Sequence, residues 1–351
     1  MRLRSLIHPH ALNQPSPERS ELPMNTLPRL SGPAELVAAV PTMLGFYPHE
    51  SLVVVFTGGT GGQVILTARI DLVPPDRVDA QVRSFLGDVL ARTPEITGIA
   101  TVIISMEKRH DVAGAVELEA TNLGLNARST VWTPQITAGG GRWECCEPCP
   151  CGGEVPPPAS TPFALASTVE TGRVIAADRA ALAQLADPVN WPTLARRRRL
   201  LDLTAVPADG PALLTAAARA SAGPLDEDQI LALGAALTGE DTLTAALTHC
   251  LGKNALAAEA VWLQLTRELP DPYAAHPAAL LTIAALLRGD GALANIAVDR
   301  ALSADPAHRL AQLLRRLVAV GIRPDALREL LDDARTAQLD TPPPARPRRI
   351  R

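Results

Sequence analysis

The pattern of apolar residues changes once along this chain, close to residue 190, and that change limits the folds that the chain can adopt. Before it, between about residues 30 and 185, short β-branched apolar runs alternate with segments whose apolar residues recur every three or four positions. From Trp191 onward only the helical spacing remains. The 351 residues suffice for about two domains. We therefore predict an α/β domain over residues 28–190 and an all-α domain over residues 191–335.

The first domain is predicted to be a mixed sheet with flanking helices, because two hairpins interrupt the alternation of strands and helices. The segment TGGTGGQ lies between two strands rather than between a strand and a helix, so it indicates a hairpin turn and not a phosphate-binding loop. The expected elements are a helix over 33–45 capped by Ser31, strands over 51–59 and 63–72, a helix over 74–94, a strand over 95–106, a helix over 111–125, strands over 126–134 and 136–146, a proline-rich loop, and a strand or helical turn followed by a helix over 164–186.

The second domain contains a stretch, residues 276–321, that resembles a tetratricopeptide helix pair. Gly289 is expected to end the first helix, Ala294 and Ala301 to lie on the packing face of the second, and Pro306 to end that second helix. Small residues at these positions let two helices approach closely. Only one unit matches well, and the characteristic Trp of its first helix is missing, whereas a true solenoid needs about three stacked units. We therefore predict a helical hairpin of tetratricopeptide type, with a repeat array as the alternative. Such helical domains often bind proteins.

Three segments together resemble the actinobacterial family called domain of unknown function 4192. They read LSGPAELVAAVPTMLGFYPHESLVVV, GGGRWECCEPCPCGGEVPPP and GDGALANIAVDRALSADPAHRLAQLL, and the resemblance extends from Leu30 to about Pro324. It implies an actinobacterial, cytoplasmic protein, in keeping with the bias toward Ala, Arg and Pro. It supplies no catalytic residue, because the family has no assigned activity.

Four of the five cysteines lie within seven residues, in a cysteine-rich loop predicted over residues 143–153; they are Cys145, Cys146, Cys149 and Cys151. Zinc is one hypothesis, since CEPC is a CxxC knuckle, but four ligands so close together would force the backbone around the metal. A redox-responsive disulfide within the cluster is the second hypothesis. The third is that the cysteines are small loop residues packed beside Trp143. Cys250 stands alone in a predicted helix and is expected to be a core residue.

A small-molecule pocket is predicted at the ends of the strands expected over 63–72 and 95–106, where polar residues lie. Arg69 and Asp71 share one face of a strand, and Glu50 precedes the neighbouring strand. An exposed ion pair is the competing interpretation for these residues. Lys108 and His110 follow the strand ATVIISM, and ligands of open sheets favour the carboxyl ends of strands. A polar helix start capped by Asp111 is the alternative there.

Positive charge is concentrated in one run, Arg196, Arg197, Arg198 and Arg199, and in the C-terminal tail. Four consecutive helical residues spread around more than a turn, so a solvated helix is one interpretation and contact with an acidic partner the other. We expect Pro/Arg-rich residues 336–351 and residues 1–27 to be disordered tails. The Pro-rich start lacks the apolar segment of a secretory signal, and Met24 is the alternative start site.

The chain carries 33 Lys and Arg against 37 Asp and Glu, a net charge of −4, which disfavours nucleic acid as the main partner. It lacks the apolar run that a membrane span needs, so we expect a soluble, cytoplasmic protein that does not bind membranes. No nucleophile elbow, paired-carboxylate motif or HExxH is present, which favours a non-enzymatic protein. Our main hypothesis is a regulatory or scaffold protein that binds other proteins through its helical half. The alternatives are a redox- or metal-responsive protein with zinc at the cysteine cluster, and a small-molecule-binding domain or enzyme with its pocket near Lys108–Asp111.

Overall fold

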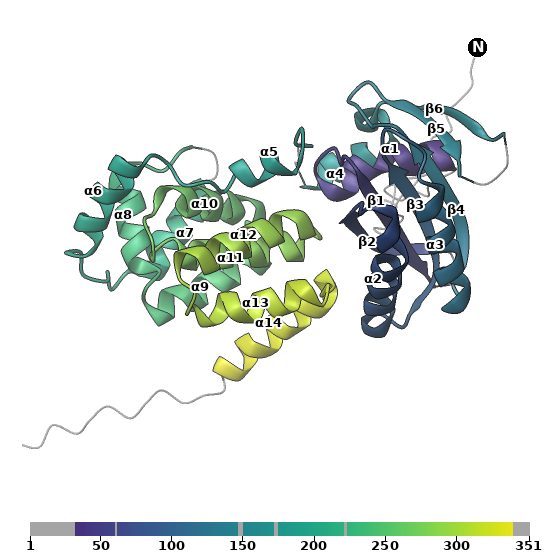
Figure 1. The fold of residues 1–351 in the computed structure, drawn as a ribbon. Helices are drawn as coiled ribbons and strands as arrows, with labels where there is room; N and C mark the ends of the chain where they lie inside the picture. Colours follow the sequence, from purple (N-terminus) through teal and green to yellow (C-terminus); the bar gives the residue numbers. More distant parts are fainter. Residues whose placement is uncertain (1–31, 60–61, 147–149, 172–174, 221–222, 340–351) are drawn as a thin grey trace, which may run out of the picture.

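The computed structural model describes residues 32–59, 62–146, 150–171, 175–220 and 223–339. The predicted tail over residues 1–27, the predicted cap Ser31, Cys149 and residues 340–351 lie outside these ranges. The predicted fold class is confirmed: a mixed sheet with flanking helices comes first and a helical half follows. The two halves lie side by side in Figure 1.

The strands of the described ranges form a six-stranded sheet in the order β2-β1-β3-β4-β5-β6. They are β1 (Ser51–Gly58), β2 (Gln63–Asp71), β3 (Ile96–Ile104), β4 (Asn126–Thr133), β5 (Gly141–Cys145) and β6 (Gly152–Val155). β3 and β4 are parallel, and every other neighbouring pair is antiparallel. Parallel strands need a long crossover, which α3 (His110–Asn122) supplies. The carboxyl ends of β3 and β4 therefore meet at one edge of the sheet.

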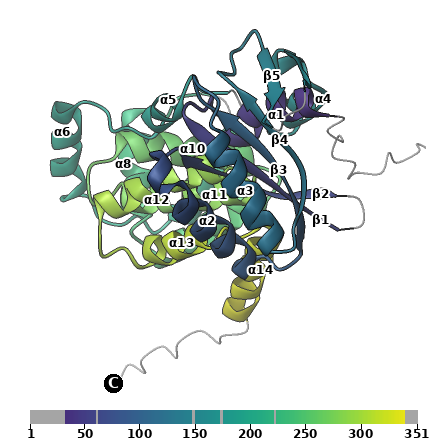
Figure 2. The same cartoon turned by 45° about the vertical axis from the view of Figure 1, so that its right-hand side comes forward.

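One face of the sheet is covered by α3 and by α2 (Val78–Arg92), which follows a short 3-10 turn (Pro75–Arg77). Figure 2 shows the two helices side by side on that face. Leu52, Val54 and Phe56 of β1 point into this layer because alternate residues of a strand face the same side. α2 buries Val78, Val82 and Leu86, which are spaced four residues apart and lie on one face of the helix.

The opposite face is covered by α1 (Pro33–Leu44) and α5 (Arg179–Gln184), which pack on Val53 and Val55. α1 begins at Pro33, whose missing N–H costs nothing at a first helical position. It ends at Gly45 with φ 80°, the left-handed conformation that glycine adopts without strain, close to where the sequence predicts the stop.

Three segments of the first half differ from the expectation. β5 begins at Gly141 rather than near residue 136, because Thr137 and Gly140 close a tight turn first. The proline-rich loop that should follow contains β6, which pairs with β5 despite its two glycines. For residues 164–186 the prediction is a strand or helical turn followed by a helix. The structure has α4 (Pro162–Thr171), then a β-bridge between Phe46 and Ala176, and then α5. Short strands held only by pairing carry no periodic signal in sequence.

The second half is helical throughout, as predicted, and its helices pack around α11 (Ala275–Leu287). Eleven of the thirteen α11 residues are buried, so this helix is apolar on nearly all sides. The helices that contact it are α9 (Glu240–Leu251), α10 (Ala255–Glu268), α12 (Gly291–Ala304), α13 (Arg309–Ala319) and α14 (Pro324–Leu339). α7 (Gly210–Ala220) packs on α9 and α10, α8 (Glu227–Ala236) packs on α7 and α10, and α6 (Trp191–Leu201) packs on α8.

α11 and α12 form a closely packed pair at the place where a tetratricopeptide-like pair is predicted. Gly289 adopts φ 77° just after α11, and α12 ends at Ala304, two residues before Pro306. Ala294 and Ala301 are both fully buried, as small packing residues should be. That the pair belongs to the tetratricopeptide type stays a prediction.

The two halves are joined by packing as well as by the chain. Ile296 of α12 belongs to the apolar cluster under the sheet. Arg92 of α2 donates a hydrogen bond of 2.9 Å to the carbonyl oxygen of Ala319, and Arg323 forms an ion pair with Glu95. The helical half therefore contacts the α/β half at two places: the apolar layer on the α1 side of the sheet, and the end of α2 with the segment that follows it.

Among the described residues, no single helix is both long and apolar enough to cross a membrane. α8 and α9 pass the same test of length and composition only when they are taken together across a bend of 108°.

A pair of histidines joins the starts of α11 and α13. His308 accepts a hydrogen bond from the Ala311 N–H at Nδ1 (3.2 Å), so its proton lies on Nε2, which donates to Nδ1 of His276 (3.1 Å). Burial lowers the pKa of His308, and burial together with the charge of His308 lowers the pKa of His276 to about 4, although Asp305 acts in the opposite direction on both. This arrangement requires both rings to be neutral.

The histidine pair predicts acid sensitivity of the helical half. Between pH 6.5 and about pH 4 the unfolded His276 binds more protons than the folded one, so stability falls as pH falls through this window. The shift corresponds to a loss of roughly 3 kcal/mol. Urea unfolding at pH 7 and pH 4 should show a smaller acid loss for the double variant His276→Leu/His308→Asn, in which Asn still caps α13. His49→Asn, at an exposed position, should behave like the wild type; equal acid loss in all three proteins would contradict the prediction.

Candidate functional site

The loop between β3 and α3 is held in one conformation at the carboxyl end of β3. Ser105 is buried, and its hydroxyl donates to the carbonyl oxygen of Glu107 (2.6 Å). The Trp132 indole N–H donates to the carbonyl oxygen of Ser105 (3.0 Å). The Lys108 ammonium lies 5.4 Å from the centre of the Trp132 ring, within reach of a cation–π contact. Lys108 is therefore aimed across β4 toward β5.

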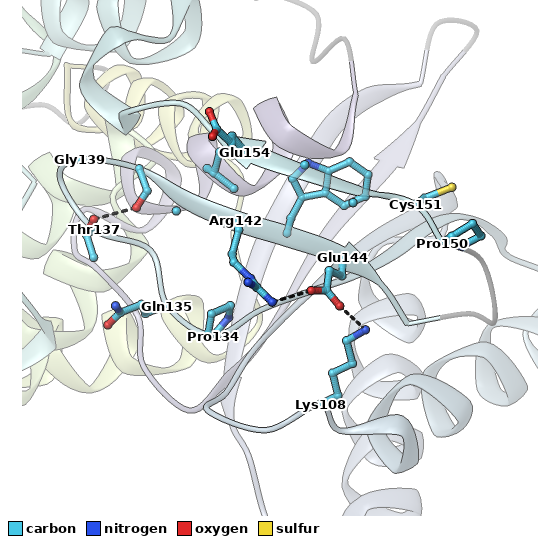
Figure 3. Close-up of a pocket in the computed structure, with 16 residues that line it drawn as sticks. Lys108, Pro134, Gln135, Thr137, Gly139, Arg142, Glu144, Pro150, Cys151 and Glu154 are labelled. Atoms are coloured by element: carbon cyan, nitrogen blue, oxygen red, sulfur yellow. Dashed lines mark hydrogen bonds and ion pairs between the residues drawn. The ribbon is translucent and has the colours of Figure 1, made fainter.

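Lys108 and β5 meet in a chain of alternating charges. Lys108 Nζ lies 2.5 Å from Glu144 Oε2, and Arg142 Nη2 lies 2.8 Å from Glu144 Oε1. Figure 3 shows the two cations on either side of the carboxylate. Hydrogen bonding to Lys108 is the largest cause that holds the pKa of Glu144 below its usual range, and Arg142 adds to it. The carboxylate stays ionised and ties the loop after β3 to the hairpin.

Lys108, Glu144 and Arg142 border a cavity of about 1130 Å³, which we call the hairpin groove. Its walls come from Lys108, the turn between β4 and β5, and both strands of the β5–β6 hairpin (Figure 3). Five glycines take part in the lining, so backbone N–H and C=O groups border the groove without side chains in front of them. The lining residues are Lys108, Pro134, Gln135, Thr137, Gly139, Gly140, Gly141, Arg142, Trp143, Glu144, Pro150, Cys151, Gly152, Gly153, Glu154 and Val155.

Gly140 is the residue that gives the groove its shape. Its φ of 95° lies in a region that L side chains avoid, and a Cβ atom there would come within 2.1 Å of the carbonyl oxygen of Val155. Only glycine lets the turn before β5 pass this close to the end of β6. The charges around the groove nearly cancel, since Lys108 and Arg142 face Glu144 and Glu154.

The structure splits the predicted pocket into two places. Arg69 and Asp71 lie on β2 and Glu50 directly precedes β1, whereas Lys108 reaches β5; β1, β3 and β4 separate β2 from β5. Of the five predicted residues, only Lys108 lines the hairpin groove. His110 is exposed at the first residue of α3.

The residues on the β1–β2 side are bound to one another and to the strands. Arg69 forms an ion pair with Asp71 and donates a hydrogen bond of 2.8 Å to the Ser51 hydroxyl. Glu50 has φ 40°, and its carboxylate accepts the Met106 N–H at 3.1 Å. These contacts hold the strand ends together and lie outside the groove.

Arg109 and Asp111 connect the start of α3 to the segment after β2. The Arg109 guanidinium binds both carboxylate oxygens of Asp111 and donates to the carbonyl oxygen of Val73 (2.8 Å). Hydrogen bonding to Arg109 lowers the pKa of Asp111.

The cysteines fall at the end of the β5–β6 hairpin. Cys145 ends β5, Cys146 is buried against the α2–α3 side of the sheet, and Cys151 is exposed next to the start of β6. No disulfide joins any two of the cysteines that the structure describes. The described residues hold no metal-binding group of three or more His, Cys, Asp or Glu, and Cys149 lies outside them, so zinc stays a prediction. Cys250 is a buried core residue as expected, and burial raises its pKa to about 12.

Three of the four predicted partner-binding arginines are engaged within the protein. Arg197 is buried and binds Glu227 of α8 and Glu268 of α10. Arg196 also reaches Glu227 (2.7 Å), and Arg198 pairs with Asp202 (2.9 Å). Arg199 is exposed. Arg197 therefore fastens α6 to α8 and α10, while contact of the exposed arginines with an acidic partner stays a prediction.

The residues that sequence reasoning missed are Arg142, Glu144 and the glycines of the hairpin. The runs AGGG and CGG were visible, but nothing in the sequence places them opposite Lys108. Pairing of β4 with β5 at Trp132 and Glu144 brings them there.

The fold and the site together describe the class of protein. It has a mixed α/β half with a polar groove near the carboxyl ends of its parallel strands, followed by a helical half. The family model described as Domain of unknown function (DUF4192) matches residues 33–325, and the chain belongs to that family. Comparisons with curated proteins and with solved structures found no match.

Arg197 and Arg196 offer a matched test of the role of the arginine run. Arg197→Ala should lower the free energy of unfolding by about 3 kcal/mol, because it leaves two carboxylates without their buried partner. Arg196→Ala removes a 60% exposed side chain from the same Glu227 and should cost less than about 1 kcal/mol. Urea unfolding measures both; equal, small losses would show that the Arg197 cluster contributes little.

Proposed function

We propose that the α/β half binds a small polar molecule in the hairpin groove. The observation that carries the proposal is the ion pair of 2.5 Å between Lys108 and Glu144, which lies in the wall of the 1130 Å³ cavity. In open sheets, ligands bind outside the carboxyl ends of the strands, and Lys108 lies in the loop that follows the carboxyl end of β3. The cavity is large enough for a small molecule, since ligand sites commonly measure about 300–1,000 Å³.

The chemistry of the lining narrows the class of ligand. Two cations and two carboxylates border the groove, so it offers no excess of either charge. Five glycines add backbone donors and acceptors. This combination supports a ligand that is uncharged or zwitterionic and rich in hydrogen-bonding groups. The family resemblance supports placing this binding in the cytoplasm of an actinobacterium.

A thermal-shift screen of nucleosides, amino acids and sugars tests the proposal. A ligand at about 100 times its Kd should stabilise the wild type by about 2.7 kcal/mol. Lys108→Met and Arg142→Met should each reduce that stabilisation, by about 1.4 kcal/mol for every tenfold loss of affinity.

Arg83→Met is the matched control for Arg142→Met. Both arginine side chains are 67% exposed and both pair with a glutamate, but Arg83 lies on α2, away from the groove. It should keep the full ligand shift. The proposal fails if no compound in the panel stabilises the wild type, or if the shift is the same in all three variants.

A second candidate function is binding of a partner protein by the helical half. It is favoured by three exposed apolar side chains around the end of α6, namely Leu200 (40%), Leu203 (87%) and Val206 (53%). The exposed Arg199 directly precedes Leu200. This composition fits an acidic segment of a partner that also carries apolar side chains. A regulatory or scaffold role, without catalysis, would follow from such binding.

Affinity capture with variants tests this second function. Proteins retained by the wild type and identified by mass spectrometry should be lost with Leu203→Asp and with Arg199→Glu, and less should be retained at high salt because ion pairs at a surface are screened. Leu330→Asp, at a 52% exposed site on α14, should retain them. A captured set that is unchanged in the first two variants would exclude this surface.

A further inference from the structure

Two of the clustered cysteines are directly opposite each other across the hairpin. The β5–β6 register pairs Trp143 with Gly153 and Glu144 with Gly152, and its next step pairs Cys145 with Cys151. The Cys145 N–H donates to the carbonyl oxygen of Cys151 at 2.9 Å, so the two residues stay opposite each other one step beyond the last pair of the ladder. The structure therefore distinguishes Cys145 and Cys151 from the rest of the cluster.

The faces of the strands separate Cys145 from its neighbour Cys146. Trp143 packs against the apolar cluster on the α1 side of the sheet, and Cys145, two residues along, faces the same side. Val131, the β4 partner of Cys145, belongs to that cluster too. Cys146 belongs instead to the cluster on the α2–α3 side. Opposed residues of an antiparallel pair share a face, so Cys151 shares its face with Cys145.

The spacing and exposure suit a disulfide bond. Opposed residues in a hydrogen-bonded antiparallel pair have Cα atoms about 5.5 Å apart, near the most common Cα separation in disulfides, about 5.5–6 Å. Cys151 is exposed and Cys145 is half-buried. An oxidant in solution can therefore reach Cys151 first. The nearby Glu144 carboxylate, which would disfavour a thiolate, is paired with Lys108 and Arg142.

We propose that Cys145 and Cys151 form a reversible disulfide when the protein meets hydrogen peroxide. The Cys151 thiolate attacks one peroxide oxygen, the O–O bond breaks, and a sulfenic acid forms while the departing hydroxide takes up a proton as water. The Cys145 thiolate then attacks that sulfur, the S–O bond breaks, and a second water leaves. Two thiols and one peroxide become one disulfide and two waters. The proposal goes beyond the binding function and does not depend on it.

Digestion after glutamate residues can locate the bond. Cleavage after positions 144 and 154 yields one peptide over 145–154 that holds all four clustered cysteines, because the proline at position 148 blocks cleavage after position 147. After treatment of the reduced full-length protein with peroxide and alkylation, this peptide should carry alkyl groups on Cys146 and Cys149 only, with Cys145 and Cys151 linked to each other (the linked species). The intact mass should fall by about 2 Da, and a reductant should restore it.

Single serine variants assign the two sulfurs. Cys145→Ser and Cys151→Ser should each reduce the linked species at least tenfold, whereas Cys146→Ser, Cys149→Ser and the buried-site control Cys250→Ser should retain it. Cys151 is exposed, so its variant tests the bond with little risk to folding. A link that requires Cys146 or Cys149, alkylation of Cys145 or Cys151 after peroxide treatment, or the absence of any mass loss would overturn the proposal.

Discussion

The structure depends on burial of β1 and β3 on both faces of the sheet. All eight residues of β1 are buried, and β3 is buried except at one position. Each fully buried Val, Leu, Ile or Phe contributes about 1.5–3 kcal/mol, so these two strands are stable only if helices cover both sides. α2 and α3 cover one side. The other needs α1 and α5, and Ile296 of the helical half completes it. Ile296 thereby joins the helical half to the apolar layer under the sheet.

The same requirement explains where the groove lies. The helices on the α2–α3 side pack over β1 and β3, while β5 and β6 continue the sheet beyond them (Figure 1). The hairpin is short and glycine-rich, and its outer strand has one pairing partner among the described strands. Lys108 reaches it from the end of β3 and fastens it through Glu144. A polar cavity and a cysteine pair consequently occupy the part of the sheet that has the least apolar cover.

In the helical half the corresponding constraint is α11, which is buried on nearly all sides. Polar groups that approach this core are paired: Arg197 with two glutamates, and His276 with His308. A buried ion cluster gains little over apolar packing, but it is costly to break. These pairs set the positions of α6 and α13 against the core more than they add stability. Arg197 is accordingly the one arginine of the run that is buried, whereas Arg196, Arg198 and Arg199 are exposed.

Strong periodicity in the amino-acid sequence is enough to predict the type and order of α1, the β1–β2 hairpin, β3 with α3, and the helices after Trp191. The spacing of the cysteines and glycines likewise predicts that they gather near one loop. β6 could not be predicted in this way, because four residues with two glycines become a strand through pairing alone. Only strand order separated Asp71 from Lys108 and brought Glu144 to Lys108 instead. The periodicity of apolar residues indicates which face of a single segment is buried. Contacts between strands far apart in the sequence depend instead on the topology of the whole sheet.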